Sequence, residues 1–116
     1  MSQQDSHYGG SLVDGARILQ LFGDVSTELM IRLNGDEGLL AAYEKVEFLS
    51  PTHAGDFLEV RATLLEVGRT SRKVELAADR YISPSPDSDS AADLLEQPVP
   101  VCRAVMVAVV PKDRQR

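Results

Sequence analysis

One long helical run constrains this chain more than any other feature. Apolar residues recur every three or four positions over residues 12–33 and fill one broad half of a helical wheel. Val13, Leu21 and Ile31 interrupt the polar half, so we expect a sheet or a second subunit to cover part of that face as well. Asn34 and Gly35 then supply the left-handed ending that helices favour. The pattern predicts one long helix in the first third of the chain.

After the helix, the pattern becomes that of strands. Strands are predicted over residues 39–49, 57–67, 71–82 and 99–110. The last of these is nearly continuous in apolar residues, which is typical of a central strand. Residues 83–98 are rich in Ser, Asp and Pro and predict a long flexible loop, with a short helical turn at residues 91–95. One helix followed by antiparallel strands indicates a single α+β domain over residues 1–116, with the sheet wrapped around the helix. Because such a sheet buries only one side of the helix, we expect a dimer.

Composition excludes several classes of protein. The chain has 116 residues, 43% of them hydrophobic and 26% charged, which is typical of one globular domain. Its net charge of -6 argues against nucleic acid as a partner. Cys102 is the only cysteine, which rules out an intrachain disulfide, and we expect it to be a small buried residue rather than a metal ligand. No apolar run approaches the roughly 20 residues that span a bilayer, and no signal-peptide core is present, so we expect a cytoplasmic protein without a membrane partner.

The helix carries two candidate catalytic carboxylates. Asp24 and Glu28 are four residues apart and therefore share a helix face, where they are candidates for a base and its partner in proton abstraction. The alternative is a surface ion-pair set with Arg17, which lies on the same less apolar arc. His7, whose ordinary pKa is near ~6.5, is either an acid–base group or a structural histidine.

The residues before the helix are candidates for binding. Ser11 and Asp14 have the Ser-x-x-Asp spacing of a helix start, and Asp14 is predicted to be a cap rather than a catalyst. Gly9 and Gly10 lie just ahead of this start, where backbone N–H groups hold an anion or a polarised carbonyl. A tight turn would explain the two glycines equally well.

A second candidate binding segment lies between two predicted strands. Residues 68–73 concentrate positive charge and hydroxyl groups in an acidic protein, and include Arg69 and Ser71. Such a cluster suits a phosphate-bearing ligand. The alternative is a solvated hairpin turn.

Taken together, several segments resemble a known family. They are residues 7–18, 22–29, 46–51, 55–57 and 67–71. This set resembles the β-aminoacyl-CoA ammonia-lyases, the group of 3-aminobutyryl-CoA and β-alanyl-CoA ammonia-lyases within the hotdog-fold superfamily. The turn at residues 55–57 is common among hotdog proteins, whereas the helix segment with Asp24 and Glu28 is more specific.

The resemblance implies a hotdog fold, an obligate dimer with the active site at its interface, and a CoA thioester substrate. In lysine fermentation the 3-aminobutyryl-CoA enzyme removes ammonia to give crotonyl-CoA, and the reverse reaction adds ammonia. No cofactor is expected, because CoA is part of the substrate. Backbone N–H groups between Gly9 and Gly15 would hold the thioester oxygen, and Asp24 or Glu28 would take the proton.

The resemblance also suggests roles for the remaining candidates. His7 or Tyr8 would orient the substrate amine or pass a proton, and Arg17 joins the expected substrate-binding set. The alternative functions are an acyl-CoA thioesterase and a non-catalytic acyl-CoA-binding module. A hotdog domain normally opens with a strand before its helix, and with only residues 1–6 ahead of His7 we expect that strand to be short or absent.

Overall fold

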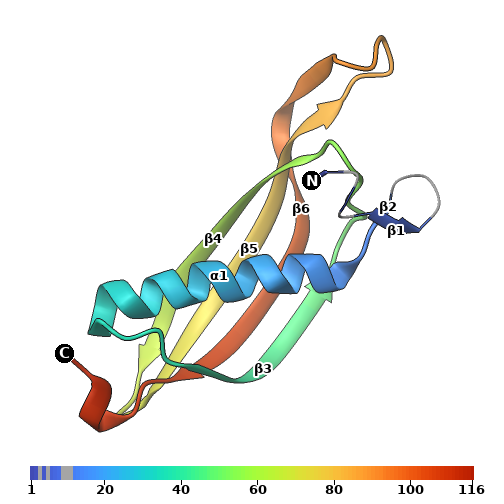
Figure 1. The fold of residues 1–116 in the computed structure, drawn as a ribbon. Coiled ribbons are helices and arrows are strands. Elements are labelled where there is room, and N and C mark those ends of the chain that lie inside the picture. The colour runs from blue at the N-terminus through green and yellow to red at the C-terminus, as the bar shows by residue number, and fades with distance from the viewer. Residues whose placement is uncertain (3, 5, 9–11) are drawn as a thin grey trace.

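A helix packed across one face of an antiparallel sheet forms the protein (Figure 1). The computed structural model describes residues 1–2, 4, 6–8 and 12–116, and only the backbone of residues 6–8. The elements are β1 (Ser6–Tyr8), β2 (Leu12–Val13), α1 (Gly15–Asn34), β3 (Leu39–Phe48), β4 (Phe57–Val67), β5 (Ser71–Pro84), β6 (Ala92–Val109) and the short 3-10 helix η3 (Lys112–Arg114). Within these described ranges, no helix is both long and apolar enough to cross a membrane.

The main sheet has the strand order β3-β6-β5-β4, and all its neighbouring strands are antiparallel. Ala104 of β6 faces Val46 of β3 on one side and Leu76 of β5 on the other, which confirms β6 as a central strand. β3 and β4 form the two edges. The first strand is short, as expected, and β1 pairs with β2 rather than with the edge of the main sheet.

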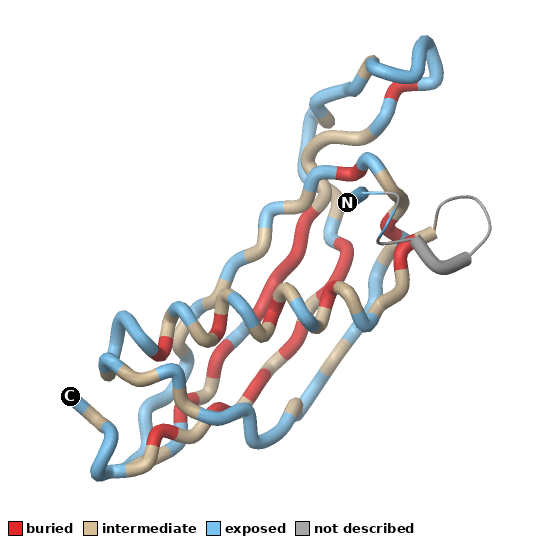
Figure 2. The backbone as a smooth tube through the Cα atoms, in the orientation of Figure 1, coloured by how far each residue is buried: buried red, intermediate tan, exposed pale blue. Residues whose placement is uncertain are grey.

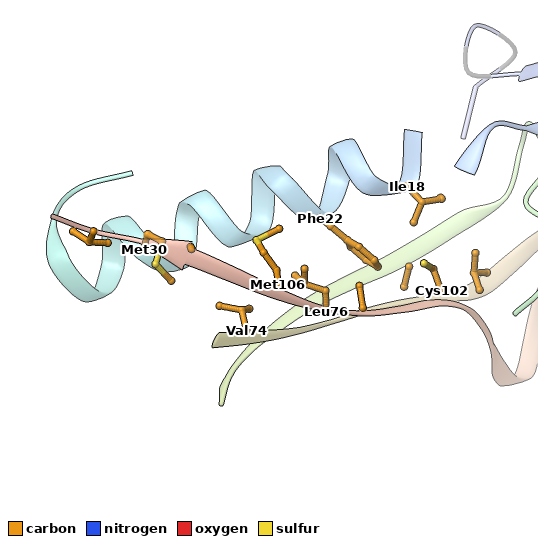
Figure 3. Packing of buried hydrophobic residues seen from close by; sticks show 12 residues of the cluster. Ile18, Phe22, Met30, Val74, Leu76, Cys102 and Met106 are labelled. Atoms are coloured by element: carbon orange, nitrogen blue, oxygen red, sulfur yellow. The ribbon is translucent and has the colours of Figure 1, made fainter. Parts of the chain in front are cut away.

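The core lies between α1 and the centre of the sheet. Ile18, Phe22, Ser26 and Met30 are the buried residues of α1, and their spacing of four places them on one helix face. Figure 3 shows Phe22 and its neighbours on α1 directed at side chains of β5 and β6, which include Val74, Leu76, Cys102 and Met106. In Figure 2 the buried residues follow β5 and β6 beneath the helix. Cys102 is fully buried, as predicted.

The helix begins three residues later than the sequence predicts. Leu12 and Val13 form β2, and the Val13 amide donates to the Thr52 carbonyl oxygen at 2.7 Å. Asp14 is extended (φ -64°, ψ 139°) and caps α1 by accepting a hydrogen bond from the Ala16 amide at 3.0 Å. The hydrogen bond to Thr52 therefore holds Leu12 and Val13 in a strand, although their spacing fits the helical pattern. The prediction of Asp14 as a cap is confirmed. The left-handed ending at Gly35 (φ 66°) is also confirmed.

The prediction of a long loop over residues 83–98 is wrong. β5 continues to Pro84 and β6 begins at Ala92, with Ile82 opposite Leu94, so strand replaces the predicted helical turn at residues 91–95. The two strands project as a hairpin beyond the body of the sheet, and its tip is largely exposed (Figures 1 and 2). Pairing that starts in the core continues outward along the ladder, and polar residues are tolerated because no core lies beneath them.

Candidate functional site

A groove with a volume of about 690 Å³ opens at the start of α1. Three parts of the chain build it: β2 with the first turn of α1, the end of β3 with the loop that follows, and Val101 of β6. Its described lining is mainly apolar, and consists of Leu12, Val13, Asp14, Gly15, Ala16, Ile18, Leu19, Phe48, Leu49, Ser50, Pro51, Thr52 and Val101. A mostly apolar groove with a few polar groups is typical of a small-molecule site.

The first turn of α1 meets the groove at Gly15. A Cβ atom at this position would lie 2.8 Å from Cε1 of Phe48, so the aromatic ring rests directly on the glycine. In this turn the Ala16 and Arg17 N–H groups donate to the side chain and to the carbonyl oxygen of Asp14, both at 3.0 Å, and the turn carries the positive end of the helix dipole. The helix dipole therefore favours an oxygen atom that develops negative charge at this end of the groove.

The loop after β3 forms the other wall of the groove and is held by hydrogen bonds. The Ser50 hydroxyl donates to the Pro100 carbonyl oxygen at 2.9 Å, and Arg80 donates to the Pro51 carbonyl oxygen at 2.9 Å. Thr52 is only 3% exposed, and within the described part of the protein its hydroxyl has no hydrogen-bond partner. Sequence reasoning missed Thr52, because only tertiary packing buries it.

Asp24 and Glu28 lie on the exposed face of α1 and outside the described lining of the groove. Asp24 is nine residues beyond Gly15, which corresponds to about 13 Å along the helix axis. Glu28 forms an ion pair with Arg32 at 2.9 Å, and both side chains are more than half exposed. Such an exposed pair contributes little to stability.

The alternative to a catalytic role, a surface ion pair, is formed by Glu28 with Arg32 rather than with Arg17. Arg17 Nη1 donates to Oε1 of Gln20 at 3.2 Å, three residues along α1. Like the two carboxylates, Arg17 lies outside the described lining of the groove. Asp14, in contrast, is a candidate substrate-binding residue that lines the groove.

The other candidates near the N-terminus cannot be compared with the groove in the same way. His7 and Tyr8 lie in β1, but their side chains are outside the described residues. Gly9 and Gly10 are outside the described residues altogether. The roles predicted for these four residues stay predictions.

The turn at residues 68–73 lies at the opposite end of α1 from the groove. Arg72 ties it there, because its guanidinium donates to the side-chain oxygen of Asn34, the last residue of α1, at 3.2 Å. The same guanidinium donates to the carbonyl oxygens of Gly68 and Ser71 at 3.0 and 2.9 Å. Arg72 is 4% exposed, so its charge stabilises the turn rather than facing a ligand.

Neighbouring carboxylates offset much of the remaining positive charge at this turn. Lys73 Nζ lies 3.1 Å from Glu44 and 3.6 Å from Glu66, and these hydrogen bonds and charges raise the pKa of Lys73. Arg69 and Ser71 are exposed, so they are the members of the predicted phosphate cluster that face solvent. In a single copy, the length of α1 separates them from the groove, about 28 Å for its 20 residues.

A buried carboxylate ties the three strands β4, β5 and β6 together away from the groove. Asp79 accepts hydrogen bonds from Arg103 at 2.7 Å and is paired with Arg61 at 2.8 Å. Burial alone would raise the pKa of Asp79, but the two arginines outweigh burial and lower it. No group of three or more side chains suited to a metal ion gathers within the described ranges.

Comparisons with known proteins place this chain in a family. The model of the thioesterase superfamily matches residues 10–80. The 3-aminobutyryl-CoA ammonia lyase of Acetoanaerobium sticklandii is 58% identical over 117 residues, an alignment that covers 100% of this chain and 93% of that protein.

Solved structures agree with this placement. The β-alanyl-CoA:ammonia lyase from Clostridium propionicum superposes with a TM-score of 0.95 at 37% identity, and the match covers 100% of this chain and 83% of that one. A hexameric hotdog-fold thioesterase of Campylobacter jejuni matches with a TM-score of 0.76 at 21% identity, over 99% and 81% of the two chains, which shows the fold alone. The chain therefore has the hotdog fold and belongs to the thioesterase superfamily, within which it is a member of the β-aminoacyl-CoA ammonia-lyase family.

Proposed function

We propose that this protein eliminates ammonia from a 3-aminoacyl-CoA, with 3-aminobutyryl-CoA as the substrate and crotonyl-CoA as the product, in a reversible reaction. The observation that carries the proposal is the 58% identity, along the whole chain, to an enzyme that bears this name. The groove at the start of α1 supports it, because it combines an apolar lining with the positive end of the helix dipole. The reaction requires no cofactor beyond the CoA of the substrate.

The first turn of α1 supplies the electrostatic part of the mechanism. Elimination removes a proton from the carbon next to the thioester carbonyl and expels ammonia from the following carbon. Negative charge then develops on the thioester oxygen, and the positive end of a helix dipole stabilises such an oxyanion. We assign this role to the Gly15 end of α1, where the helix meets the groove.

Asp24 is the base in this proposal, and a second copy of the chain supplies it. Within one copy, Asp24 lies about 13 Å along α1 from Gly15, too far to reach a substrate held at the first turn. Two copies related by a two-fold axis, joined edge to edge, set their helices antiparallel. The middle of one helix then lies beside the start of the other. Glu28 supports Asp24, and His7 and Tyr8 orient the amine.

The edge formed by β3 is the surface that we propose for this pairing. Among the described strands, β3 has a sheet neighbour on one side only, and Leu39 and Leu40 near its start are more than half exposed. An exposed apolar edge strand is a template for pairing with another chain. β3 also leads into the groove through Phe48, so a homo-oligomer formed here completes the site. The same two-fold arrangement brings Arg69 and Ser71 of one copy toward the groove of the other, where they suit the phosphates of CoA.

Single substitutions of the two carboxylates test the catalytic assignment. Crotonyl-CoA formation from 3-aminobutyryl-CoA is followed for the wild type and for Asp24→Asn and Glu28→Gln. We expect Asp24→Asn to lose at least a hundredfold in kcat, as typical for an acid–base group, and Glu28→Gln to lose less. Glu96→Gln, an exposed change on the β5–β6 hairpin, is the matched control. Full activity in both helix variants would refute the assignment.

The same samples decide between elimination and thioester hydrolysis. The superfamily model favours an acyl-CoA thioesterase as the second candidate function. Hydrolysis releases a free CoA thiol, whereas elimination leaves the thioester intact and produces an enoyl absorbance and ammonia. We expect the enoyl product without thiol release. Thiol release without enoyl product would identify a thioesterase instead.

A further inference from the structure

Strand β6 carries one extra residue where it passes the groove. Cys102 lies opposite Ala78 of β5, and Pro100 lies opposite Asp79. Two steps along β6 therefore match one step along β5, and Val101 is the extra residue. Such a β-bulge redirects a side chain, and bulges are common next to active sites. The direction of the Val101 side chain is thus set by this bulge and not by the ordinary alternation of a strand.

The bulge turns Val101 toward the helix side of the sheet. From Cys102 onward, every second residue of β6 belongs to the buried core beneath α1, namely Cys102, Ala104, Met106 and Ala108. Simple alternation would place Val101 on the opposite face. It belongs instead to the same core cluster, together with Ile18 of α1, and is 1% exposed. Because Val101 also lines the groove, it lies where the core and the groove meet.

The backbone of Val101 is joined to the wall of the groove that follows β3. The Val101 carbonyl oxygen accepts from the Leu49 amide at 2.8 Å and from the Ser50 amide at 3.4 Å, and both residues line the groove. Ile18 lines it from the side of α1. Val101 and Ile18 are the least exposed of the described lining residues, at 1% and 2%. They therefore mark the inner end of the groove.

We propose that Val101 sets the length of the acyl chain that the groove accepts; this inference rests on the proposed function and deepens it. Ile18 lies three residues beyond Gly15, which corresponds to about 4.5 Å along the helix axis. With the thioester carbonyl at the Gly15 end, the three C–C bonds of a butyryl chain, about 1.5 Å each, extend about 4 Å beyond it. Its terminal methyl group then reaches the inner end of the groove, and a longer chain would need the space that Val101 fills.

Substitutions of Val101 should move this limit in both directions. Because Val101 lines the groove, the space that Val101→Ala vacates joins the groove and does not form a closed cavity. Val101→Ile adds one carbon to a side chain whose other surroundings are close-packed core, so the added carbon extends into the groove. Alanine should therefore admit a longer acyl chain, and isoleucine should favour the shorter 3-aminopropionyl chain.

The test measures kcat/KM for ammonia elimination from 3-aminopropionyl-, 3-aminobutyryl- and 3-aminohexanoyl-CoA in the full chain. One methylene group in an apolar pocket changes kcat/KM by about 10–200-fold. We therefore expect Val101→Ala to raise the ratio of 3-aminohexanoyl-CoA to 3-aminobutyryl-CoA at least about tenfold. Val101→Ile should raise the ratio of 3-aminopropionyl-CoA to 3-aminobutyryl-CoA by a similar factor. Each ratio is taken on one sample, so the fraction of folded protein cancels.

Val74→Ala is the matched control. Val74 belongs to the same core cluster and is fully buried, but it lies outside the described lining of the groove. We expect Val74→Ala to lower the melting temperature while leaving both ratios unchanged. Unchanged ratios in the Val101 variants would overturn the inference. An equal change in Val74→Ala would overturn it too, since general loosening of the core would then explain the result. If the alanine variant does not fold, Val101→Ile decides the question alone.

The fate of the proposed function is read separately. A wild type that forms no enoyl product from any of the three substrates would refute the lyase proposal. Dissociation constants of butyryl-CoA and hexanoyl-CoA would still decide whether Val101→Ala shifts the groove toward longer chains. A wild type that eliminates ammonia equally well from 3-aminobutyryl-CoA and 3-aminohexanoyl-CoA would refute the length limit although the lyase is active.

Discussion

Replacing Gly15 with alanine separates the stability of α1 from the shape of the groove. The new Cβ would lie 2.8 Å from Cε1 of Phe48, whereas carbon atoms pack best at about 3.5–4.0 Å. The ring must therefore retreat by about 1 Å. Phe48 is 56% exposed, so it has room to move outward at little cost. Alanine is also favoured over glycine in a helix by about 0.5–1 kcal/mol.

We expect Gly15→Ala to change the free energy of unfolding by less than about 1 kcal/mol, because the two effects oppose each other. The displaced ring alters the groove, however, and a misplacement of about 1 Å near a reacting group costs up to a hundredfold in rate. The prediction is a ten- to hundredfold loss in kcat/KM for crotonyl-CoA formation. Stability is measured by urea unfolding and activity by the enoyl absorbance.

Gly23→Ala is the matched control for helix stability. A Cβ at Gly23 meets nothing within 4 Å, so the substitution should stabilise the protein by about 1 kcal/mol through helix propensity alone. Wild-type activity in Gly15→Ala would refute the idea that the ring bounds the substrate path. Destabilisation by more than about 2 kcal/mol would show instead that Phe48 is fixed.

Three further predictions concern the core and the sheet. Phe22→Ala should lower the free energy of unfolding by about 3–5 kcal/mol, because Phe22 is fully buried between α1 and the sheet; a loss below 1 kcal/mol in urea unfolding would contradict that packing. Asp79→Asn should destabilise the protein by about 1–3 kcal/mol at pH 7. The lowered pKa of Asp79 means that its stabilisation is complete above the usual carboxyl pKa near ~4 and is lost as pH falls through the folded-state pKa, so the gap to wild type should narrow in acid; a gap that is constant with pH would refute the linkage. Burial raises the pKa of Cys102 to about 11, so its thiol should resist a thiol-specific reagent at pH 8 until denaturant is added; rapid labelling of the folded protein would show that the thiol is accessible.

The sequence by itself determined the elements whose signal is local. Ile18, Phe22 and Met30 are separated by four and eight residues, and this spacing specifies both the helix and its buried face, because helical periodicity needs no distant partner. Alternation located β3 and β4, and the continuous apolar run identified β6 as central. The resemblance to the ammonia-lyases also came from sequence, because the matching segments keep residue types in fixed positions along the chain.

Only the tertiary structure decided the features that depend on distant partners. Val13 leaves the helix because its amide bonds to Thr52, and the 68–73 turn loses much of its positive charge to Glu44 and Glu66 from other parts of the chain. The hairpin over residues 82–94 forms because its pairing extends a ladder that begins in the core. Periodicity and composition describe each segment alone, whereas these contacts join residues far apart in sequence. The burial of the Thr52 hydroxyl likewise results from packing, so it cannot be predicted from the position of Thr52 in the sequence.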